Sequence, residues 1–369
     1  MPQGENFWNP YRWVEVSDEA IQHEEPHYHH RFEGISGRIE CTLTALTPLI
    51  IGDGHGRFVT HKAKGRPYIP ATSLKGVIRS LAEIVGNAAV PFPNVPVDRN
   101  HALNQARREQ NGRVLYDPVA RTFGYLNRGN VFAGLIQFSD AELVGHANPA
   151  QWPQHTVAVG QPRPSHKPFY PDNERRKVYR HIPEAQSLTP PHAGITQTTS
   201  NRCAPPGTQF IFTVDFRNLR DEELGLLLYC LALEEAVSVT LSKESLRPDA
   251  REPVTICGPM RHKIGGCKPH GAGSAHIQII KLTIRTDPAD RYRGQDSAQT
   301  FEGEELAEEL RRCTASFAQR NDKTMQQLRA MMIYTPKDPR RPVNYPTHQW
   351  FEDDKQLPTD QKRPLKPTL

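Results

Sequence analysis

The chain has 369 residues, 37% of them hydrophobic, with 33 prolines and 25 glycines, which predicts a folded protein with many loops and one large core or two small ones. Its formal net charge of +5 is too small to indicate a charged partner unless the basic residues cluster locally. No run approaches the roughly 18 apolar residues of a membrane span, and the N-terminus lacks the basic and apolar regions of a signal peptide, so we expect a cytoplasmic protein that contacts no membrane.

Residues 1–34 are polar, rich in histidine and aromatic side chains, and show little periodicity, so we interpret them as an extended N-terminal arm. Apolar and polar residues then alternate over residues 39–45, which is the period of a half-buried strand. A glycine-punctuated loop follows and contains Asp53 and His55, with His61 just beyond it. The order so far is a strand and then a loop that carries candidate functional groups.

A helix is predicted after Pro70, with Thr72 or Ser73 as its cap and a buried apolar face that continues to residue 85. The free N–H groups at a helix start form a weak anion site, and Lys75 and Arg79 add positive charge one turn apart. These residues are therefore candidate phosphate contacts. The alternative is a well-capped amphipathic helix whose basic side chains are merely solvated.

The middle of the chain contains a predicted helical turn at residues 117–124, a strand at 131–138, and a long stretch without strong periodicity from about 150 to 207. We interpret the long stretch as an insertion, because it exceeds an ordinary connection in a compact domain. Cations and aromatic rings alternate in it, a pattern suited to phosphates and bases or, alternatively, to a solvated hairpin. The candidate RNA contacts in it are Arg163, Lys167, Tyr170, Arg176, Lys177, Tyr179 and Arg180.

The second half of the chain opens with the clearest strand, at residues 208–216, and continues with a helix from 221 to about 237. A strand is predicted from about 276 to 284, and residues 302–312 and 324–334 have helical patterns. Residues 335–369 form a proline-rich polar tail without a core-forming pattern. Most of the predicted core therefore lies before residue 285.

A glycine-rich loop occupies residues 261–274, just before the last predicted strand. Glycines allow a ligand to approach the backbone amides closely, and basic side chains in the loop supply countercharge for a phosphodiester chain. Its candidate RNA contacts are Lys263, Gly265, Gly266, Lys268, Gly271 and Gly273. A zinc site is an alternative use of the same stretch, although the spacing of its possible ligands fits no strong pattern; these are Cys257, His262, Cys267 and His270.

The predicted elements follow the β-α-β-β-α-β order of an α+β, ferredoxin-like (RRM-type) core with long insertions. Three motifs in this order resemble those of the RAMP superfamily of CRISPR-associated proteins. They are Ile51-Gly52 leading to residues 68–76 and Arg79, then Phe123-Gly124 with Gly134 and Asp140, and last the loop from Gly265-Gly266 to Gly273. The resemblance covers roughly residues 35–285 and is closest to the backbone subunits of type III effector complexes, in particular to single-chain proteins with a long central insertion.

This resemblance implies a ferredoxin-like core at residues 35–285, interrupted by the insertion at about 150–207. Residues 1–34 would be the arm, 286–334 a helical C-terminal extension and 335–369 the tail. It further implies a subunit that grips guide RNA along its phosphate backbone, contacts target RNA, and assembles with other RAMP-type and large subunits of a CRISPR complex in antiviral defence.

Some backbone subunits of the family also cut target RNA with an aspartate in the loop between the first strand and the first helix, assisted by a divalent metal such as Mg²⁺. Asp53 is the only acid in that loop here, but it directly follows Ile51-Gly52, whereas the family's aspartate tends to lie nearer the helix. His55 or His61 could act as the general base. A metal-dependent endoribonuclease, or a guide-processing RAMP ribonuclease, is therefore the alternative to a binding subunit, and a stand-alone zinc or scaffold protein is a third.

Overall fold

The computed structural model describes residues 9–15, 19–61, 65–89, 106–158, 175–183, 198–246, 250–287, 289, 293, 298–340, 343, 348–358, 361–362 and 369. Arg163, Lys167 and Tyr170, which the sequence suggests as RNA contacts, lie outside these residues. In the part of the chain that is described, no helix combines the length and the apolar character needed to cross a membrane.

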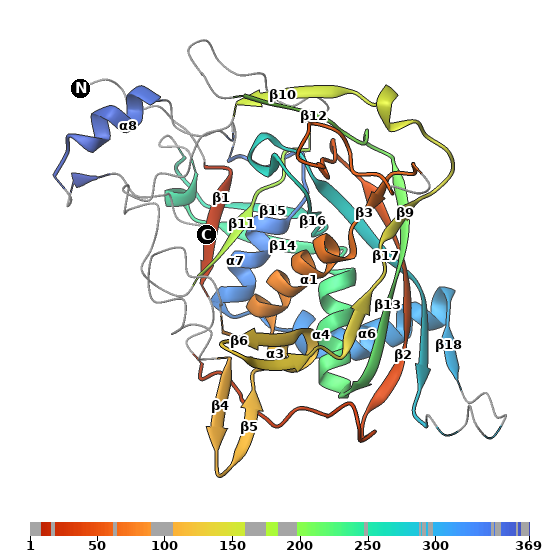
Figure 1. Ribbon diagram of the computed structural model, residues 1–369. Coiled ribbons are helices and arrows are strands. Elements are labelled where there is room, and N and C mark those ends of the chain that lie inside the picture. Colours follow the sequence, from red (N-terminus) through yellow and green to blue (C-terminus); the bar gives the residue numbers. More distant parts are fainter. Residues whose placement is uncertain are drawn as a thin grey trace.

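A mixed α and β architecture is built around one antiparallel sheet (Figure 1). Its long strands are β2 (Ile35–Ala45), β13 (Gln209–Leu219) and β17 (Ser274–Arg285). The strand order is β16-β17-β2-β13-β9-β3, with β18 beside β17 and β8 beside β13. The short strands are β3 (Tyr68–Ile69), β8 (Ile136–Phe138), β9 (Ala141–Leu143), β16 (His262–Lys263) and β18 (Gln299–Phe301).

The sheet has one buried and one more exposed face, as the alternating sequence predicts. Ile39, Cys41 and Leu43 of β2 are buried, while the polar residues between them are only partly covered. Strands predicted at residues 39–45, 208–216 and 276–284 are confirmed within β2, β13 and β17. The prediction of one continuous strand at residues 131–138 is wrong. The segment forms two strands, β7 (Asn130–Ala133) and β8, which are separated by Gly134 and Leu135.

Helices cover the buried face of the sheet (Figure 1). They are α1 (Ala71–Val85), α3 (Pro118–Phe123), α4 (Asp221–Ala232), α6 (Gly303–Ala318) and α7 (Lys323–Met332). Nearly every side chain of α4 from Glu223 to Leu231 is buried, because α1, α6 and β17 all pack against it. The helices predicted at 117–124, 302–312 and 324–334 are confirmed by α3, α6 and α7. The helix predicted from 221 to about 237 is confirmed by α4 as far as Ala232, and the predicted end is wrong because Val237 already begins β14.

Five two-stranded ribbons of described residues surround this core, and one contains part of the N-terminal arm. In that ribbon β1 (Tyr11–Glu15) pairs with β11 (Arg175–Tyr179) and packs against α7. β10 (Gln154–Ala158) pairs with β12 (Thr198–Arg202) within the insertion. The others are β4 (Arg107–Gln110) with β5 (Arg113–Tyr116), β6 (Gly124–Asn127) with β7, and β14 (Val237–Leu241) with β15 (Val254–Gly258).

The chain ends contribute more to the packed structure than the sequence pattern predicts. Tyr11, Trp13 and Val14 of β1 are buried, although the arm shows no periodicity. The C-terminal tail contains helix α8 (His348–Lys355), and its Trp350 is buried. Both segments depend on contacts with residues far away in the sequence, which a local pattern does not reveal.

Asn218, near the C-terminal end of β13, fixes the connection between the arm and the sheet. It is buried and has a left-handed backbone conformation, with φ of 60°. Its Oδ1 accepts hydrogen bonds from the backbone N–H groups of Glu33 and Gly34, both at 2.7 Å. Its Nδ2 donates to the carbonyl oxygens of Tyr28 and Arg31 at 3.0 and 2.8 Å. One side chain therefore satisfies four backbone groups of the segment that enters β2.

We expect Asn218→Ala to lower the free energy of unfolding by about 3 kcal/mol or more, because four backbone groups lose their partner and alanine is strained at positive φ. Urea unfolding measures this change. Asn111→Ala is the matched control, since Asn111 also has positive φ but lies exposed in the β4–β5 turn, and it should cost only about 1 kcal/mol. Equal losses in the two variants would contradict the role given to the Asn218 side chain.

Candidate nucleic-acid interface

The glycine loop, residues 261–274, packs against the segment that follows β2. Gly266 donates its N–H to the carbonyl of Ile50 and Gly273 donates to that of Pro48, both at 2.9 Å. At Gly265, with φ of 82°, a Cβ atom would lie 2.1 Å from the oxygen of Ile50. Any side chain there would separate the two loops. The glycines therefore allow two loops that are far apart in the sequence to pack backbone against backbone.

The backbone amides of this loop are used largely inside the protein. Besides Gly266 and Gly273, Gly271 donates its N–H to the carbonyl of Lys268 at 3.1 Å. The Lys263 ammonium donates to the carbonyls of Gly271 and Ala272 at 3.1 and 2.8 Å, and burial lowers its pKa to about 7. Lys268, the other cation of the loop that is expected to contact RNA, donates to no carbonyl among the described residues.

β11 carries basic and aromatic side chains beside this loop. The Lys177 ammonium lies 3.7 Å from the ring centroid of Tyr11 and 5.3 Å from that of Tyr179. The Lys268 ammonium lies 5.9 Å from the Tyr179 centroid, so both cations approach one ring. Burial lowers the pKa of Lys177 to about 8 and also lowers that of Lys268. We call Lys177, Tyr179 and Lys268, all of them half-buried, the β11 patch.

His181 fixes the end of β11 to the glycine loop. Its Nδ1 lies 2.9 Å from the Ser274 hydroxyl and its Nε2 lies 2.9 Å from the carbonyl oxygen of Arg261. The ring is buried, and burial together with the nearby Lys263 charge holds its pKa well below the ordinary value. A neutral ring can donate one hydrogen bond and accept the other. The two halves of the β11 patch are thus held together by a bridge that carries no charge.

The other face of β11 turns its two arginines inward. Arg176 forms an ion pair with Glu83, a buried residue of α1 that also pairs with Arg79. Arg180 is buried beside Arg12 and Arg340. The alternation of a strand explains this division, since residues 177 and 179 share one face and residues 176, 178 and 180 the other. Arg176 therefore has an internal partner that the sequence did not indicate.

The start of α1 does not have the predicted cap. Pro70 is the N-cap residue, so the capping role expected of Thr72 or Ser73 is wrong. The Asp140 carboxylate instead accepts a hydrogen bond from the Ala71 N–H at 2.8 Å. An internal carboxylate thus occupies the positive end of the helix, where the sequence suggested a phosphate. This contact was not predictable locally, because Asp140 lies 69 residues away.

Lys75 and Arg79 on α1 are both directed at backbone carbonyls. The Lys75 ammonium donates to Ile136 at 3.3 Å, and Arg79 donates to Gly124 at 3.0 Å. Burial lowers the pKa of both side chains. The Arg79 charge lowers the pKa of Lys75 further, whereas the Asp117 carboxylate partly offsets the lowering at Arg79. These bonds hold α1 against the segments around β6 and β8. The two residues are available to a ligand only if they exchange these partners.

Asp53 lies in a tight turn and is hydrogen bonded through both carboxylate oxygens. Oδ1 accepts from the N–H groups of His55 and Arg57 at 2.8 and 3.2 Å, and Oδ2 accepts from the Arg57 guanidinium at 2.9 Å. These bonds, of which the one from His55 has the largest effect, lower the pKa of Asp53. His61 stacks on Tyr68, with centroids 3.8 Å apart, and His55 is exposed. The arrangement is that of an aspartate that caps a turn.

The possible zinc ligands have separate surroundings. His262 is buried and its Nε2 lies 2.8 Å from the carbonyl of Cys230 on α4, while Cys257 is exposed on β15. Cys267 packs in a small apolar cluster with Ile50, Val157 and Cys203. Within the described ranges, no three His, Cys, Asp or Glu side chains are grouped so that they could hold a metal ion.

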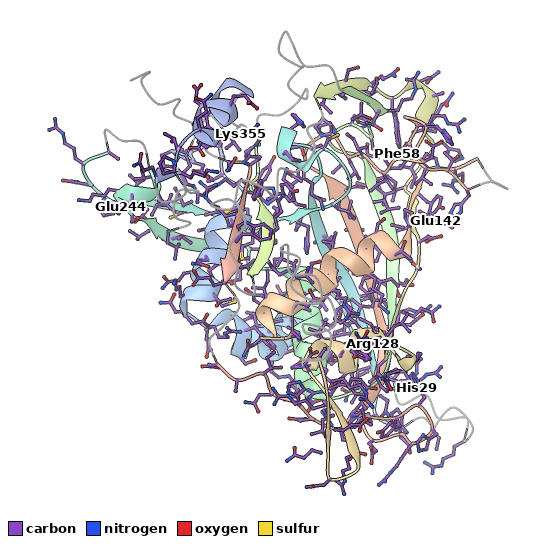
Figure 2. The ribbon with its side chains drawn as sticks, turned by 60° about the vertical axis from the view of Figure 1, so that its left-hand side comes forward. His29, Phe58, Arg128, Glu142, Glu244 and Lys355 are labelled. Atoms are coloured by element: carbon purple, nitrogen blue, oxygen red, sulfur yellow. The ribbon has the colours of Figure 1, made fainter. Side chains whose placement is uncertain are left out.

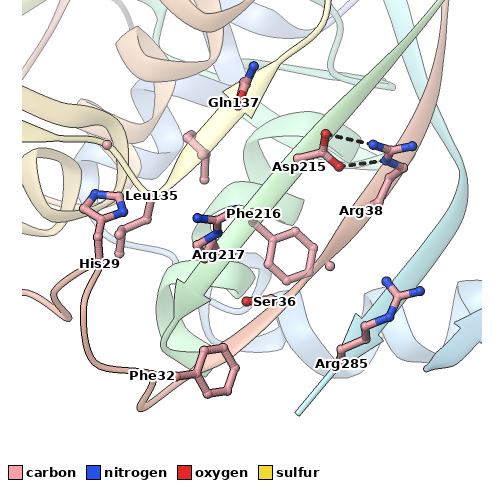
Figure 3. A pocket seen from close by; sticks show the side chains of 13 residues that line it. His29, Phe32, Ser36, Arg38, Leu135, Gln137, Asp215, Phe216, Arg217 and Arg285 are labelled. Carbon is pink, nitrogen blue, oxygen red and sulfur yellow. Dashed lines mark hydrogen bonds and ion pairs between the residues drawn. The ribbon is translucent and has the colours of Figure 1, made fainter. Parts of the chain in front are cut away.

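A second basic region lies at the opposite end of the sheet. It is a cleft of about 640 Å³, which we call the sheet cleft. In Figure 2, Phe58 marks the end of the molecule near the glycine loop and His29 marks the end near the cleft. Figure 3 shows Arg38 and Asp215 facing each other across β2 and β13, bonded at 2.7 and 3.0 Å. The cleft is lined by His29, Phe32, Ser36, Gly37, Arg38, Gly134, Leu135, Ile136, Gln137, Asp215, Phe216, Arg217 and Arg285.

Sequence reasoning missed the arginines of the sheet cleft and the contributions of Arg12 and Arg340. Arg38, Arg217 and Arg285 lie in strands whose register places them together, but they are isolated charges in the sequence. An alternating strand pattern could have placed them on the exposed face. Arg12 and Arg340 lie in segments without periodicity, and no sequence signal brings them together.

Comparison with known proteins identifies the family of the chain. No curated protein matches it significantly. The family model of the RAMP superfamily matches residues 42–236, a range that includes β2, α1, β13 and α4. This range is more than half of the chain, and it ends before the glycine loop. The chain therefore belongs to the RAMP superfamily of CRISPR-associated proteins.

Proposed function

We propose that this protein is an RNA-binding backbone subunit of a type III CRISPR effector complex, and that it holds guide RNA through the phosphate backbone and contributes to target RNA binding. Membership of the RAMP superfamily supports a CRISPR-related RNA-binding role. The observation that carries the proposal is the β11 patch, in which Lys177 and Lys268 approach the same Tyr179 ring from two distant parts of the chain.

The chemistry of the β11 patch suits a single RNA strand. Two ammonium groups can neutralise successive phosphates, and the ring between them offers a face for a base. Both kinds of contact tolerate any base. A subunit that holds guide RNAs of many sequences requires this tolerance. The patch is fixed by the neutral His181 bridge and by the packing of the glycine loop on Ile50, so its geometry exists before RNA binds.

We further propose that the core is the ferredoxin-like β-α-β-β-α-β unit. The chain order β2, α1, β8 with β9, β13, α4 and β17 supports this assignment. In this unit β2 is the first strand, β8 with β9 the second, β13 the third and β17 the fourth. The strands lie in the order β17-β2-β13 with β8 and β9 beyond, so the fourth strand is beside the first and the third lies between the first and the second. All of these pairings are antiparallel, as that fold requires.

RAMP proteins act in CRISPR complexes with RNA and other subunits, and we propose other RAMP-type and large subunits as partners of this chain. The exposed face of the sheet is a suitable contact surface for them. Ile211 of β13 and Ile280 of β17 are half exposed there, at 50% and 42%. A partner subunit bound to this face would not cover the β11 patch, which lies on a separate ribbon and stays accessible to RNA.

The nuclease alternative depends on Asp53. Its two oxygens already accept three hydrogen bonds, one of them from the Arg57 guanidinium. A metal ion would have to compete with that cation for the carboxylate, because both need the same lone pairs. These bonds favour a structural turn, and we therefore prefer RNA binding to cleavage as the function of this chain.

We expect Lys177→Ala combined with Lys268→Ala to weaken binding of single-stranded RNA about tenfold at moderate salt, because two phosphate contacts are lost. The salt slope of log affinity should fall by about 1.4, at about 0.7 for each contact. Fluorescence anisotropy at several salt concentrations measures both changes. The matched control is Arg217→Ala with Arg285→Ala in the sheet cleft, which removes two charges at the other end of the sheet. A larger loss from the cleft pair would place the RNA there instead.

We expect RNA affinity to fall as pH rises from 7 to 9. Burial lowers the pKa of Lys177 to about 8, so its charge is lost within this window, and affinity at pH 9 should approach that of Lys177→Ala. The sign for stability is opposite, because between about 8 and 10.5 the unfolded chain holds the proton that the folded chain has lost, and stability rises with pH. Lys177→Arg keeps its charge and should bind with a flatter pH profile. Identical profiles for Lys177→Arg and the unmodified protein would contradict this role.

We expect Asp53→Asn to leave RNA affinity within about twofold, because the side chain still accepts from the turn N–H groups and makes no RNA contact in this proposal. Neither this variant nor the unmodified protein should cut a complementary target RNA in the presence of Mg²⁺. Gel analysis of end-labelled RNA tests both statements. Cleavage by the unmodified protein that disappears in Asp53→Asn would establish the nuclease alternative.

A further inference from the structure

Three arginine guanidinium groups are buried close to one another near the β1–β11 ribbon. Arg12, Arg180 and Arg340, which we call the arginine cluster, are 3%, 2% and 1% exposed. The Arg180 N–H donates to the Pro10 carbonyl at 2.8 Å, and Arg12 pairs with Val178 in the same ribbon, so Arg12 and Arg180 are neighbours. Burial lowers the pKa of Arg180, and the charges of Arg340 and Arg12 lower it further, so Arg340 also lies within electrostatic reach. They come from β1, the end of β11 and the segment after α7, so three distant parts of the chain converge on this point.

One carboxylate compensates this charge among the described residues. Asp338 pairs with Arg340 through two hydrogen bonds, at 2.8 and 2.7 Å. Arg12 donates through Nη1 to the carbonyl of its neighbour Tyr11 at 2.9 Å, and its Nε has no partner. With three arginines and one aspartate, the cluster has a formal charge of +2 in the protein interior.

Arg180 carries most of the unsatisfied hydrogen-bonding capacity. Its Nε, Nη1 and Nη2 are all buried without a hydrogen-bond partner, as is Nη1 of Arg340. A guanidinium presents its donors in a planar fork that matches the oxygens of a phosphate or carboxylate. Burying such a group without an anion is strongly unfavourable, and a well-packed apolar residue would be the more stable alternative. The packing of the fold alone does not explain Arg180.

We propose that Arg12, Arg180 and Arg340 form a buried binding site for one dianionic phosphate group, either the terminal phosphate of a bound RNA or free inorganic phosphate. A phosphate monoester carries close to two negative charges at neutral pH and would neutralise the cluster. An internal phosphodiester or a carboxylate carries one and would leave a buried positive charge. The RNA source rests on the proposed function: Arg180 directly follows Tyr179 of the β11 patch but lies on the other face of the strand, so the end of an RNA bound at the patch would pass around β11 to reach the cluster.

The first test uses thermal unfolding in buffer without phosphate or sulfate and then with inorganic phosphate added. The melting temperature of the unmodified protein should rise by about 3 °C at phosphate concentrations near 100 times the dissociation constant. Arg180→Met should melt at a higher temperature than the unmodified protein without phosphate, because an uncompensated buried charge is removed, and should not respond to phosphate. Arg38→Met, in an exposed ion pair with Asp215, is the control and should respond like the unmodified protein.

The second test distinguishes the two sources of the phosphate. RNAs of one sequence with a 5′-phosphate, a 3′-phosphate or hydroxyls at both ends are compared in binding to the unmodified protein and to Arg180→Met. If the site takes an RNA end, one of the two phosphorylated RNAs binds the unmodified protein about tenfold more tightly than the RNA with hydroxyls at both ends. All three RNAs then bind Arg180→Met with the same affinity. If it takes free phosphate, the three RNAs bind alike while the melting temperature still rises with phosphate.

The proposal is overturned if the melting temperature of the unmodified protein is independent of phosphate and its RNA affinity is independent of the RNA ends. This criterion needs no variant, so it holds even if Arg180→Met fails to fold. Binding of RNA without either effect would reject the phosphate site and keep the proposed function. A phosphate response without RNA binding would keep the site and reject the proposed function.

Discussion

The structure depends on the backbone contact between the glycine loop and the segment after β2. The carbonyl of Ile50 lies where a side chain at residue 265 would be, so the two loops can meet only because that residue is glycine. Thr47 reinforces the contact, since its hydroxyl donates to the Gly271 carbonyl at 2.8 Å and accepts from the Ser274 N–H at 2.9 Å. Ser274 in turn bonds His181, so the position of β11 follows from this packing.

The basic side chains of this protein fall into those that have an internal partner and those that do not. Arg176 and Arg79 pair with the buried Glu83, and Lys75 and Lys263 donate to backbone carbonyls, so these residues hold elements together. Lys177 and Lys268 contact aromatic rings at a partly exposed surface, and the Arg180 guanidinium has no hydrogen-bond partner among the described residues. The distinction separates structural cations from those that a negatively charged ligand would complete.

The sequence predicts the parts of the fold whose pattern is local. β2, β13 and β17 alternate and α4 follows the helical period, because each buries one face against the core. The insertion was expected to carry RNA contacts, and its strand β11 does bring Lys177 and Tyr179 next to Lys268. The burial of β1, the cap from Asp140 and the meeting of Arg12 with Arg180 and Arg340 were not predictable, because each depends on partners more than 60 residues apart in the chain.

The central claim is that RNA lies along the β11 patch, and photochemical crosslinking of the RNA that co-purifies with the protein from its native host tests it most directly. Mass spectrometry of the crosslinked peptides locates the contact. Our account predicts short guide RNAs crosslinked at Tyr179 or at residues of the glycine loop near Lys268. Crosslinks confined to Phe32 and its neighbours in the sheet cleft, or protein that carries no RNA, would contradict it.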